Sequence, residues 1–128
     1  MSVPSYNNHV VLFVDDEEKT RKYFSRLFGE KFQILLAEDG VEALEVFKQN
    51  VDDIAVVVTD QRMPNMTGSQ LLEKVTELKP SCIRILSTAY SDIDAAIDAV
   101  NKAGMYQYVT KPWEVNDLEV VIMRAIEL

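Results

Sequence analysis

Five short apolar segments alternate along the chain with longer segments of helical periodicity. The short segments are rich in β-branched and aromatic residues and end abruptly, which is typical of strands buried on both faces. Between and after them, apolar residues recur every three or four positions, which is typical of helices that cover a sheet. The predicted strands span residues 10–14, 33–37, 54–59, 82–87 and 105–109.

The predicted helices each carry an apolar stripe. We expect a left-handed glycine cap at Gly29 after the first helix and at Gly104 after the fourth, and Pro80 should end the third. Alternating strands and helices predict an α/β fold with a parallel sheet covered on both faces. We expect a flavodoxin-like, doubly wound sheet of order 2-1-3-4-5 with five helices. The stripes are Phe24, Leu27 and Phe28; Ala43, Leu44 and Phe47; Leu71, Leu72, Val75 and Leu78; Ile93, Ala96, Ile97 and Val100; and Leu118, Val121, Ile122 and Ala125.

The chain has 128 residues, enough for one core of ordinary size, so we expect a polar leader over residues 1–8 and one domain over residues 9–128. A formal net charge of −8 argues against direct contact with nucleic acid, which requires clustered cations. There is no membrane-length apolar run and no signal-peptide pattern, and the single cysteine, Cys82, reads as a buried thiol. These features predict a cytoplasmic protein.

Polar residues stand where the predicted strands end. Asp15 and Asp16 follow the first strand, Asp60 the third, Thr88 the fourth and Lys111 the fifth. Ligands of such folds bind at the carboxyl ends of the strands, beside the point where the strand order reverses. Two carboxylates about 4 Å apart repel by about 4 kcal/mol at an effective dielectric near 20, so three of them need a cation. Oxygen ligands alone favour Mg²⁺, with Mn²⁺ as an alternative.

Such a site suits phosphoryl transfer to a carboxylate. Asp60 would be the nucleophile, and its acyl phosphate would need neutralising charge more than a base. Lys111 and the metal would supply that charge, and Thr88 could hydrogen-bond a phosphoryl oxygen. Taken singly, Asp15, Asp16 and Thr88 could be helix caps, Asp60 could open a turn, and Lys111 could be a solvated charge. Their convergence on adjacent strand ends favours one shared site.

Two motifs, Asp60-Gln61-Arg62-Met63-Pro64 and Thr110-Lys111-Pro112-Trp113, are specific enough to suggest a family. Over about residues 10–127, the sequence resembles the receiver (CheY-like) domains of bacterial two-component response regulators. The resemblance implies that a sensor histidine kinase phosphorylates Asp60 from a phosphohistidine. It also implies that Asp16, Asp60 and the backbone carbonyl of Arg62 bind Mg²⁺, with Asp15 acting through water, and that Pro112 follows a cis peptide bond. Such a domain is a switch and not a conventional enzyme.

The resemblance also implies how the signal leaves the site. Thr88 would be pulled inward and Tyr108 would turn with it, altering the face formed by the fourth helix, fifth strand and fifth helix. That face, with Tyr106, Trp113 and Met123, could meet an output domain, an effector or a second receiver. The motif wording resembles receivers joined to transcriptional activators or to cyclic-di-nucleotide phosphodiesterases.

Arg62 and Tyr90 depart from the commoner receiver pattern, at positions that shape the access of water to an acyl phosphate. Arg62 could cover the phosphoryl group or pair with a neighbouring acid. His9, the only histidine, starts the first strand, and we assign it no role in the chemistry.

Two rival functions remain open. A haloacid-dehalogenase-like phosphohydrolase would carry a second aspartate two residues after its nucleophile, where this chain has Arg62. A receiver-like adaptor would work without phosphorylation, although such proteins usually lose the acceptor or the acidic pair, and both are present here.

Overall fold

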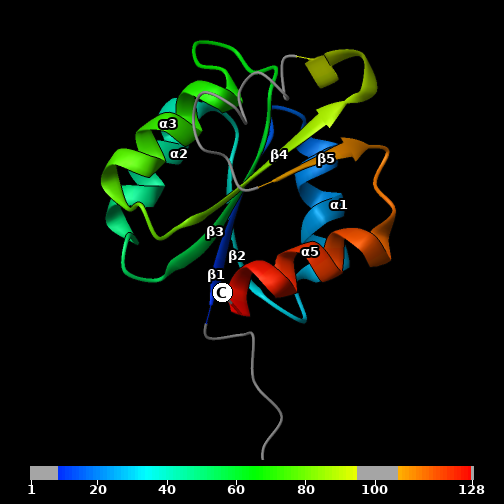
Figure 1. The fold of residues 1–128 in the computed structure, drawn as a ribbon, viewed down its shortest axis with the longest axis horizontal. Helices are drawn as coiled ribbons and strands as arrows, with labels where there is room; N and C mark the ends of the chain where they lie inside the picture. The colour runs from blue at the N-terminus through cyan, green and yellow to red at the C-terminus, as the bar shows by residue number, and fades with distance from the viewer. Residues whose placement is uncertain (1–8, 95–106, 128) are drawn as a thin grey trace, which may run out of the picture.

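The structure, a computed structural model, describes residues 9–94 and 107–127. Within these ranges a five-stranded sheet has the order β2-β1-β3-β4-β5, and every neighbouring pair is parallel (Figure 1). The predicted flavodoxin-like α/β fold is therefore confirmed. The strands are β1 (Val10–Val14), β2 (Gln33–Ala37), β3 (Ile54–Asp60), β4 (Ile83–Ala89) and β5 (Gln107–Lys111).

Helices cover both faces of the sheet. The α2 and α3 helices lie on one face, and α1 and α5 lie on the other (Figure 1). Of the five predicted helices, four are present in the described ranges; the stripe of the predicted fourth helix lies outside them except for Ile93, as do Gly104 and Tyr106. No helix in the described ranges is long and apolar enough to cross a membrane. The helices are α1 (Glu18–Phe28), α2 (Gly40–Gln49), α3 (Gly68–Leu78) and α5 (Val115–Glu127), with a short 3₁₀ turn η2 (Tyr90–Asp92) after β4.

The sheet separates two apolar cores, and alternate residues of each strand enter different cores. From β1, Leu12 packs with α2 and α3, whereas Phe13 packs with α1 and α5. All five β1 residues are buried, which explains why the strand reads as a continuous apolar run. The side of the sheet toward α1 and α5 is hereafter the α1–α5 side, and the other is the α2–α3 side.

Several predicted boundaries differ from the structure. Strands β3, β4 and β5 continue through Asp60, Ala89 and Lys111, one or two residues past the predicted ends. Backbone pairing continues where the side chains turn polar, so Asp60 and Lys111 each close a strand instead of following it. The predicted left-handed cap at Gly29 is wrong, because its φ of −64° is right-handed and its N–H donates to the Ser25 carbonyl. Leu78, predicted to be in a core, is 45% exposed.

Gly68 begins α3 and holds this helix close to the end of β3. A Cβ at Gly68 would lie 2.2 Å from the carbonyl oxygen of Asp60 and 2.9 Å from Leu86 Cδ1. Only a residue without a side chain allows this approach. The close contact fixes the distance between α3 and the strand end that carries Asp60.

Substitution Gly68→Ala tests this packing. We expect the free energy of unfolding to fall by about 2 kcal/mol, because backbone atoms must move to admit the methyl group. Gly40→Ala is the matched control, because Gly40 is also a buried glycine at the start of a helix. Its added Cβ would meet the side chain of Met66, which can move more easily than backbone atoms. Urea unfolding of both variants measures the difference, and equal losses would contradict the packing argument.

Candidate functional site

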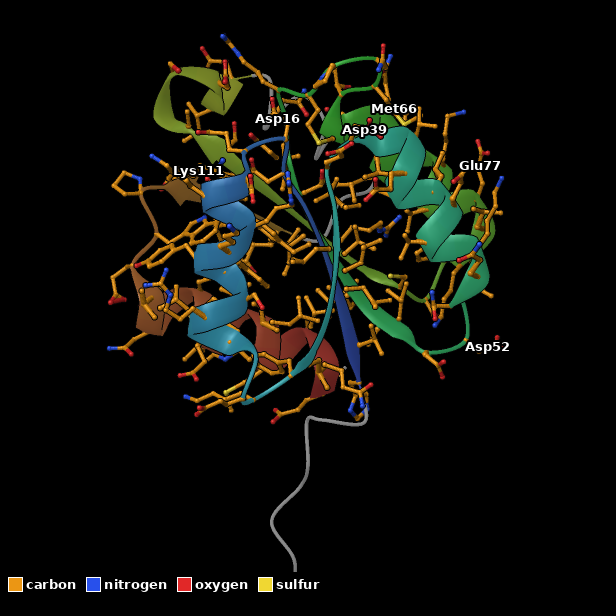
Figure 2. The ribbon with its side chains drawn as sticks, turned by 180° about the vertical axis from the view of Figure 1, so that it is seen from behind. Asp16, Asp39, Asp52, Met66, Glu77 and Lys111 are labelled. Atoms are coloured by element: carbon orange, nitrogen blue, oxygen red, sulfur yellow. The ribbon has the colours of Figure 1, made fainter. Side chains whose placement is uncertain are left out.

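Three carboxylates meet at the carboxyl ends of β1 and β3. One oxygen from each of Asp15, Asp16 and Asp60 lies within 4.8 Å of the others. Asp15 is fully buried, the side chain of Asp60 is 13% exposed, and Asp16 is exposed. Figure 2 shows Asp16 and Lys111 toward one end of the molecule, with Asp52 at the opposite end. The predicted site residues of these strands are therefore together in space.

Strand register explains why they meet. Val14 of β1 pairs with Thr59 of β3, so the next residues, Asp15 and Asp60, lie beside each other. Asp60 pairs in turn with Ser87, and Lys111 closes β5 opposite Ala89. Side chains alternate between the two faces of a strand, which puts Asp60, Ser87 and Lys111 on the α1–α5 side.

Lys111 links two of the carboxylates. Its Nζ donates to Asp15 Oδ2 at 2.7 Å and to Asp60 Oδ2 at 3.2 Å. The peptide bond that follows, between Lys111 and Pro112, is cis. Burial alone would lower the pKa of Lys111, but the hydrogen bond and charge of Asp15, together with Asp60, outweigh it and raise this pKa. Lys111 is therefore a fixed positive charge at this site.

The cluster keeps a negative excess, because one ammonium faces three carboxylates. Burial raises the pKa of Asp60, and the charge of Asp15 adds to this effect, while Lys111 opposes it. A site that disfavours its own charge, and that offers only oxygen atoms as ligands, fits a hard divalent cation such as Mg²⁺. The residues present therefore fit the metal that the sequence predicts.

Asp15 is held from two directions. Its Oδ1 accepts the N–H of Glu17 at 2.9 Å, and Arg21 of α1 donates from Nη1 to its backbone carbonyl at 2.8 Å. The N-cap residue of α1 is Glu17, which makes no side-chain cap bond, so neither aspartate is the helix cap that we considered. The buried carboxylate is thus shared, with Oδ1 accepting from Glu17 and Oδ2 from Lys111.

Gln61 organises the loop between β3 and α3, a role that the sequence analysis missed. Its N–H donates to Asp60 Oδ1 at 2.7 Å, and its carbonyl accepts the Gly68 N–H at 3.0 Å. Its side-chain oxygen accepts two hydrogen bonds from Ser69, one from the N–H and one from the hydroxyl. The sequence signal that could have indicated this role was an amide side chain directly after Asp60, the predicted phosphoacceptor. These bonds fix the backbone that carries the Arg62 carbonyl.

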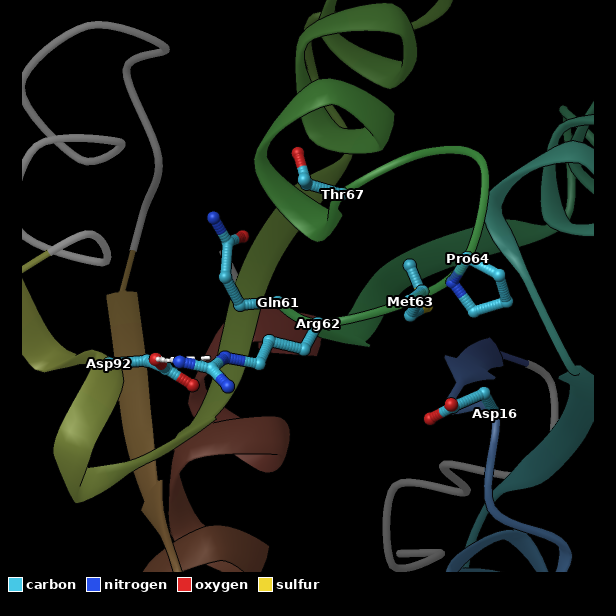
Figure 3. Close-up of a pocket in the computed structure, with 7 residues that line it drawn as sticks. All are labelled: Asp16, Gln61, Arg62, Met63, Pro64, Thr67 and Asp92. Carbon is cyan, nitrogen blue, oxygen red and sulfur yellow. Dashed lines mark hydrogen bonds and ion pairs between the residues drawn. The ribbon is translucent and has the colours of Figure 1, made fainter.

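Arg62 pairs with an acid, one of the two alternatives that its sequence position left open. Its Nη2 lies 2.8 Å from Asp92 Oδ1, and its Nε donates to the same oxygen at 3.0 Å (Figure 3). The pair joins the β3–α3 loop to η2 across a cleft of about 490 Å³. The cleft is the opening beside the acidic cluster, and it is lined by Asp16, Gln61, Arg62, Met63, Pro64, Thr67 and Asp92.

Thr88 and Tyr108 lie on the other side of the sheet. Thr88 is fully buried in β4, and its hydroxyl makes a long 3.5 Å contact with the Ala89 carbonyl. Tyr108 pairs with Leu86 and is half-buried against the core on the α2–α3 side. Because side chains alternate along a strand, Thr88 and Tyr108 lie on the same side of the sheet. Thr88 directly follows Ser87, which pairs with Asp60 of the acidic cluster.

Two residues lie far from the cluster. His9 is half-buried just before β1, and with Cys82 it lines a separate cavity at the opposite end of the sheet. Cys82 is buried as predicted, and burial raises its pKa to about 11. Neither belongs to the site.

The family model described as response regulator receiver domain matches residues 11–123. The chain belongs to this receiver family. It is 36% identical over 117 residues to the hydrogenase transcriptional regulatory protein HoxA of Cupriavidus necator, and 34% identical over 118 residues to the DNA-binding transcriptional regulator NtrC of Escherichia coli. Each alignment covers 91% of this chain but 24% of the relative, so the chain spans about a quarter of their length.

A solved receiver domain has the same fold. The crystal structure of a response regulator receiver domain protein from Clostridium thermocellum matches with a TM-score of 0.88 and 30% identity. The match covers 93% of this chain and 94% of the other. Receiver domains are the switch modules of two-component signalling, and the chain is a receiver of this class.

Removing the Asp60 charge should stabilise the metal-free receiver. Because the pKa of Asp60 is raised, its ionised form costs stability at neutral pH, and this cost disappears as the pH falls through the raised pKa. We therefore expect Asp60→Asn to raise the melting temperature by a few degrees at pH 7 without metal, and by less near pH 4. Added Mg²⁺ should stabilise the native protein more than the variant.

The control is Asp52→Asn, which changes the net charge equally at the exposed, opposite end of the molecule. Differential scanning calorimetry with and without Mg²⁺ measures all three proteins. A lower melting temperature for Asp60→Asn at pH 7 would mean that its ion pair with Lys111 outweighs the cost of burial.

Proposed function

We propose that this receiver is a phosphoacceptor in which Asp60 takes a phosphoryl group from the phosphohistidine of a sensor histidine kinase. The observation that carries the proposal is the double contact of Lys111 with Asp15 and Asp60 inside a cluster of three carboxylates. It supports a site that accumulates negative charge and needs fixed positive charge to do so. Residues 9–128 form the receiver unit in this proposal, with residues 1–8 as its leader.

The phosphoryl transfer involves the residues of the acidic cluster. A carboxylate oxygen of Asp60 forms the new bond to phosphorus while the bond from phosphorus to the histidine nitrogen breaks, and the imidazole keeps that electron pair. Asp16, Asp60 and the Arg62 carbonyl would hold Mg²⁺ or Mn²⁺, with Asp15 acting through water. When bound, the metal neutralises charge on the phosphoryl oxygens. Lys111 opposes the same charge, and Thr88 donates a hydrogen bond to a phosphoryl oxygen.

The output follows from Thr88 and Tyr108. The contact of the Thr88 hydroxyl with the Ala89 carbonyl is long and weak, so it could be exchanged for one to a phosphoryl group, and Tyr108 shares its side of the sheet. Movement there would alter the α4-β5-α5 face, which comprises β5, α5 and the predicted fourth helix. Trp113 and Met123, which we expected on this face, are half-buried against the α1–α5 core, so each would offer the face only part of its side chain.

The partners follow from the relatives. They are transcriptional regulators about four times the length of this chain, so we assign an output domain, an effector protein or a second receiver to the α4-β5-α5 face. The net charge of −8 argues that any DNA contact belongs to another domain. The proposed location is the cytoplasm, where a histidine kinase presents its phosphohistidine. The chain would act as a switch that catalyses only its own phosphorylation and dephosphorylation.

Intact-protein mass spectrometry after incubation with acetyl phosphate tests this function. We expect the mass to rise by one phosphoryl group, to require Mg²⁺ or Mn²⁺, and to stay unchanged in Asp60→Asn. Asp52→Asn, at the opposite end, should be labelled like the native chain. No labelling by acetyl phosphate or by a kinase would indicate an adaptor that works without phosphorylation. Repeated turnover of a phosphate ester would indicate a phosphohydrolase.

Arg62 and Asp92 offer a test of phosphoryl lifetime. Arg62 is 79% exposed, so its ion pair is screened and is expected to contribute less than about 1 kcal/mol. We propose that Arg62, with Tyr90, limits the access of water to phospho-Asp60. Arg62→Ala should then speed the decay of the phosphorylated form by about two- to fivefold. Asp92→Asn frees Arg62 for the phosphoryl group and should slow this decay.

The decay is followed by mass after the phosphodonor is removed. Arg62→Lys is the matched variant, because it keeps a positive charge but loses the two-nitrogen contact with Asp92. Equal decay rates in the native chain and all three variants would exclude a role of Arg62 in access.

A further inference from the structure

Trp113 makes a partly buried hydrogen bond that the proposed chemistry does not use. Its indole Nε1 donates to Ser87 Oγ at 2.8 Å, and Ser87 is fully buried. The indole ring also meets the edges or faces of three aromatic rings, with centroid distances of 5.6 Å to Phe13, 5.7 Å to Phe24 and 6.0 Å to Tyr23. The ring is therefore fixed on all these sides.

The hydrogen bond joins two parts of the site. Ser87 is the register partner of Asp60 and is followed directly by Thr88. Trp113 stands two residues after Lys111, beyond the cis bond to Pro112. The contact thus ties the end of β4, beside the phosphoacceptor, to the turn that follows Lys111.

Lys111 needs such an anchor because of its position in the sheet. β5 is the last strand in the sheet order, so within residues 9–94 and 107–127 it pairs with β4 alone, and their pairing ends at Ala89 and Lys111. A lysine side chain has four flexible bonds, and its Nζ must still reach both Asp15 and Asp60. A fixed point just after Lys111 reduces the freedom of the backbone from which that side chain extends.

Simple core packing does not account for this pair. A phenylalanine would fill the same aromatic cluster without bringing a polar group into it. Leaving an indole N–H buried without an acceptor costs about 1–3 kcal/mol, and the Ser87 hydroxyl removes this cost only in one geometry. The hydrogen bond between Trp113 and Ser87 therefore fixes the position of the indole ring, in addition to the packing of that ring.

We propose that Trp113 and Ser87 are positioning residues that hold Lys111 in register with Asp60 for phosphoryl transfer. This inference rests on the proposed function, since it concerns the same reaction. Lys111 opposes charge that develops during transfer, so misplacing it lowers the maximal rate more than it alters the concentration of donor needed.

The test compares Ser87→Ala and Trp113→Phe with the native chain, using acetyl phosphate and saturating Mg²⁺. Trp113→Phe keeps an aromatic ring in the cluster but loses the N–H and part of the ring area, so it serves where Ser87→Ala impairs folding. We expect the maximal labelling rate to fall about fivefold in each variant, with the half-saturating donor concentration changed less than twofold. The double variant should be no slower than the slower single variant, because both changes break the same bond.

Two further measurements separate positioning from a loss of stability. Val75→Ala removes apolar volume from α3 on the far side of the sheet, and it should label at the native rate despite a lower melting temperature. Trp113 is the only tryptophan, so one indole ¹H–¹⁵N resonance reports its hydrogen bond, and Ser87→Ala should shift it.

The outcomes are distinct. Native rates in both single variants, or equal slowing in Val75→Ala, would overturn the positioning role while leaving Asp60 as the phosphoacceptor. An additive double variant would also overturn it. Absence of labelling in the native chain would overturn the proposed function, and this inference with it.

Discussion

The site depends on one partly buried ammonium, that of Lys111, between two carboxylates. Lys111 contacts a fully buried Asp15 and a largely buried Asp60, and without it two negative charges would lie side by side in a poorly solvated place. Asp15 accordingly receives structural support from Glu17 and Arg21 that Asp16, which is exposed, does not need. Asp15 therefore acts as the anchor for Lys111, which leaves Asp60 and Asp16 as the carboxylates nearer to solvent.

The predicted site residues come from both sides of the parallel sheet. Asp60, Ser87 and Lys111 face the α1–α5 side, whereas Thr88 and Tyr108 face the α2–α3 side. Neighbouring residues of a strand point in opposite directions, so Thr88 and Ser87 face opposite layers of helices, and Ser87 accepts a hydrogen bond from Trp113. In the proposed function, the end of β4 would therefore contact both layers of helices beside the phosphoacceptor.

The sequence predicted the fold and the members of the acidic cluster because both follow from simple periodicities. Apolar runs define strands, and the carboxyl ends of parallel strands must share an edge, so Asp15, Asp60 and Lys111 could be grouped before any coordinates. The ends of the strands were less predictable, since a backbone ladder continues through polar residues such as Asp60. The contacts of Gln61, and the partner of Arg62, depend on loop geometry and side-chain rotamers, which no periodicity encodes.

The charges of the cluster do not balance. The three carboxylates and one ammonium leave the cluster with an excess negative charge, and burial makes that charge costly at Asp60. A divalent cation would relieve the excess, and in the proposed function a phosphoryl group would then add negative charge beside that cation and Lys111. The metal-free cluster is therefore electrostatically unfavourable, and the same residues would make the metal-bound, phosphorylated state favourable. Lys111 already carries its full charge, so its electrostatic contribution depends on the distance from its Nζ to the other charges and not on a still higher pKa. The position of Lys111 therefore matters more than its basicity.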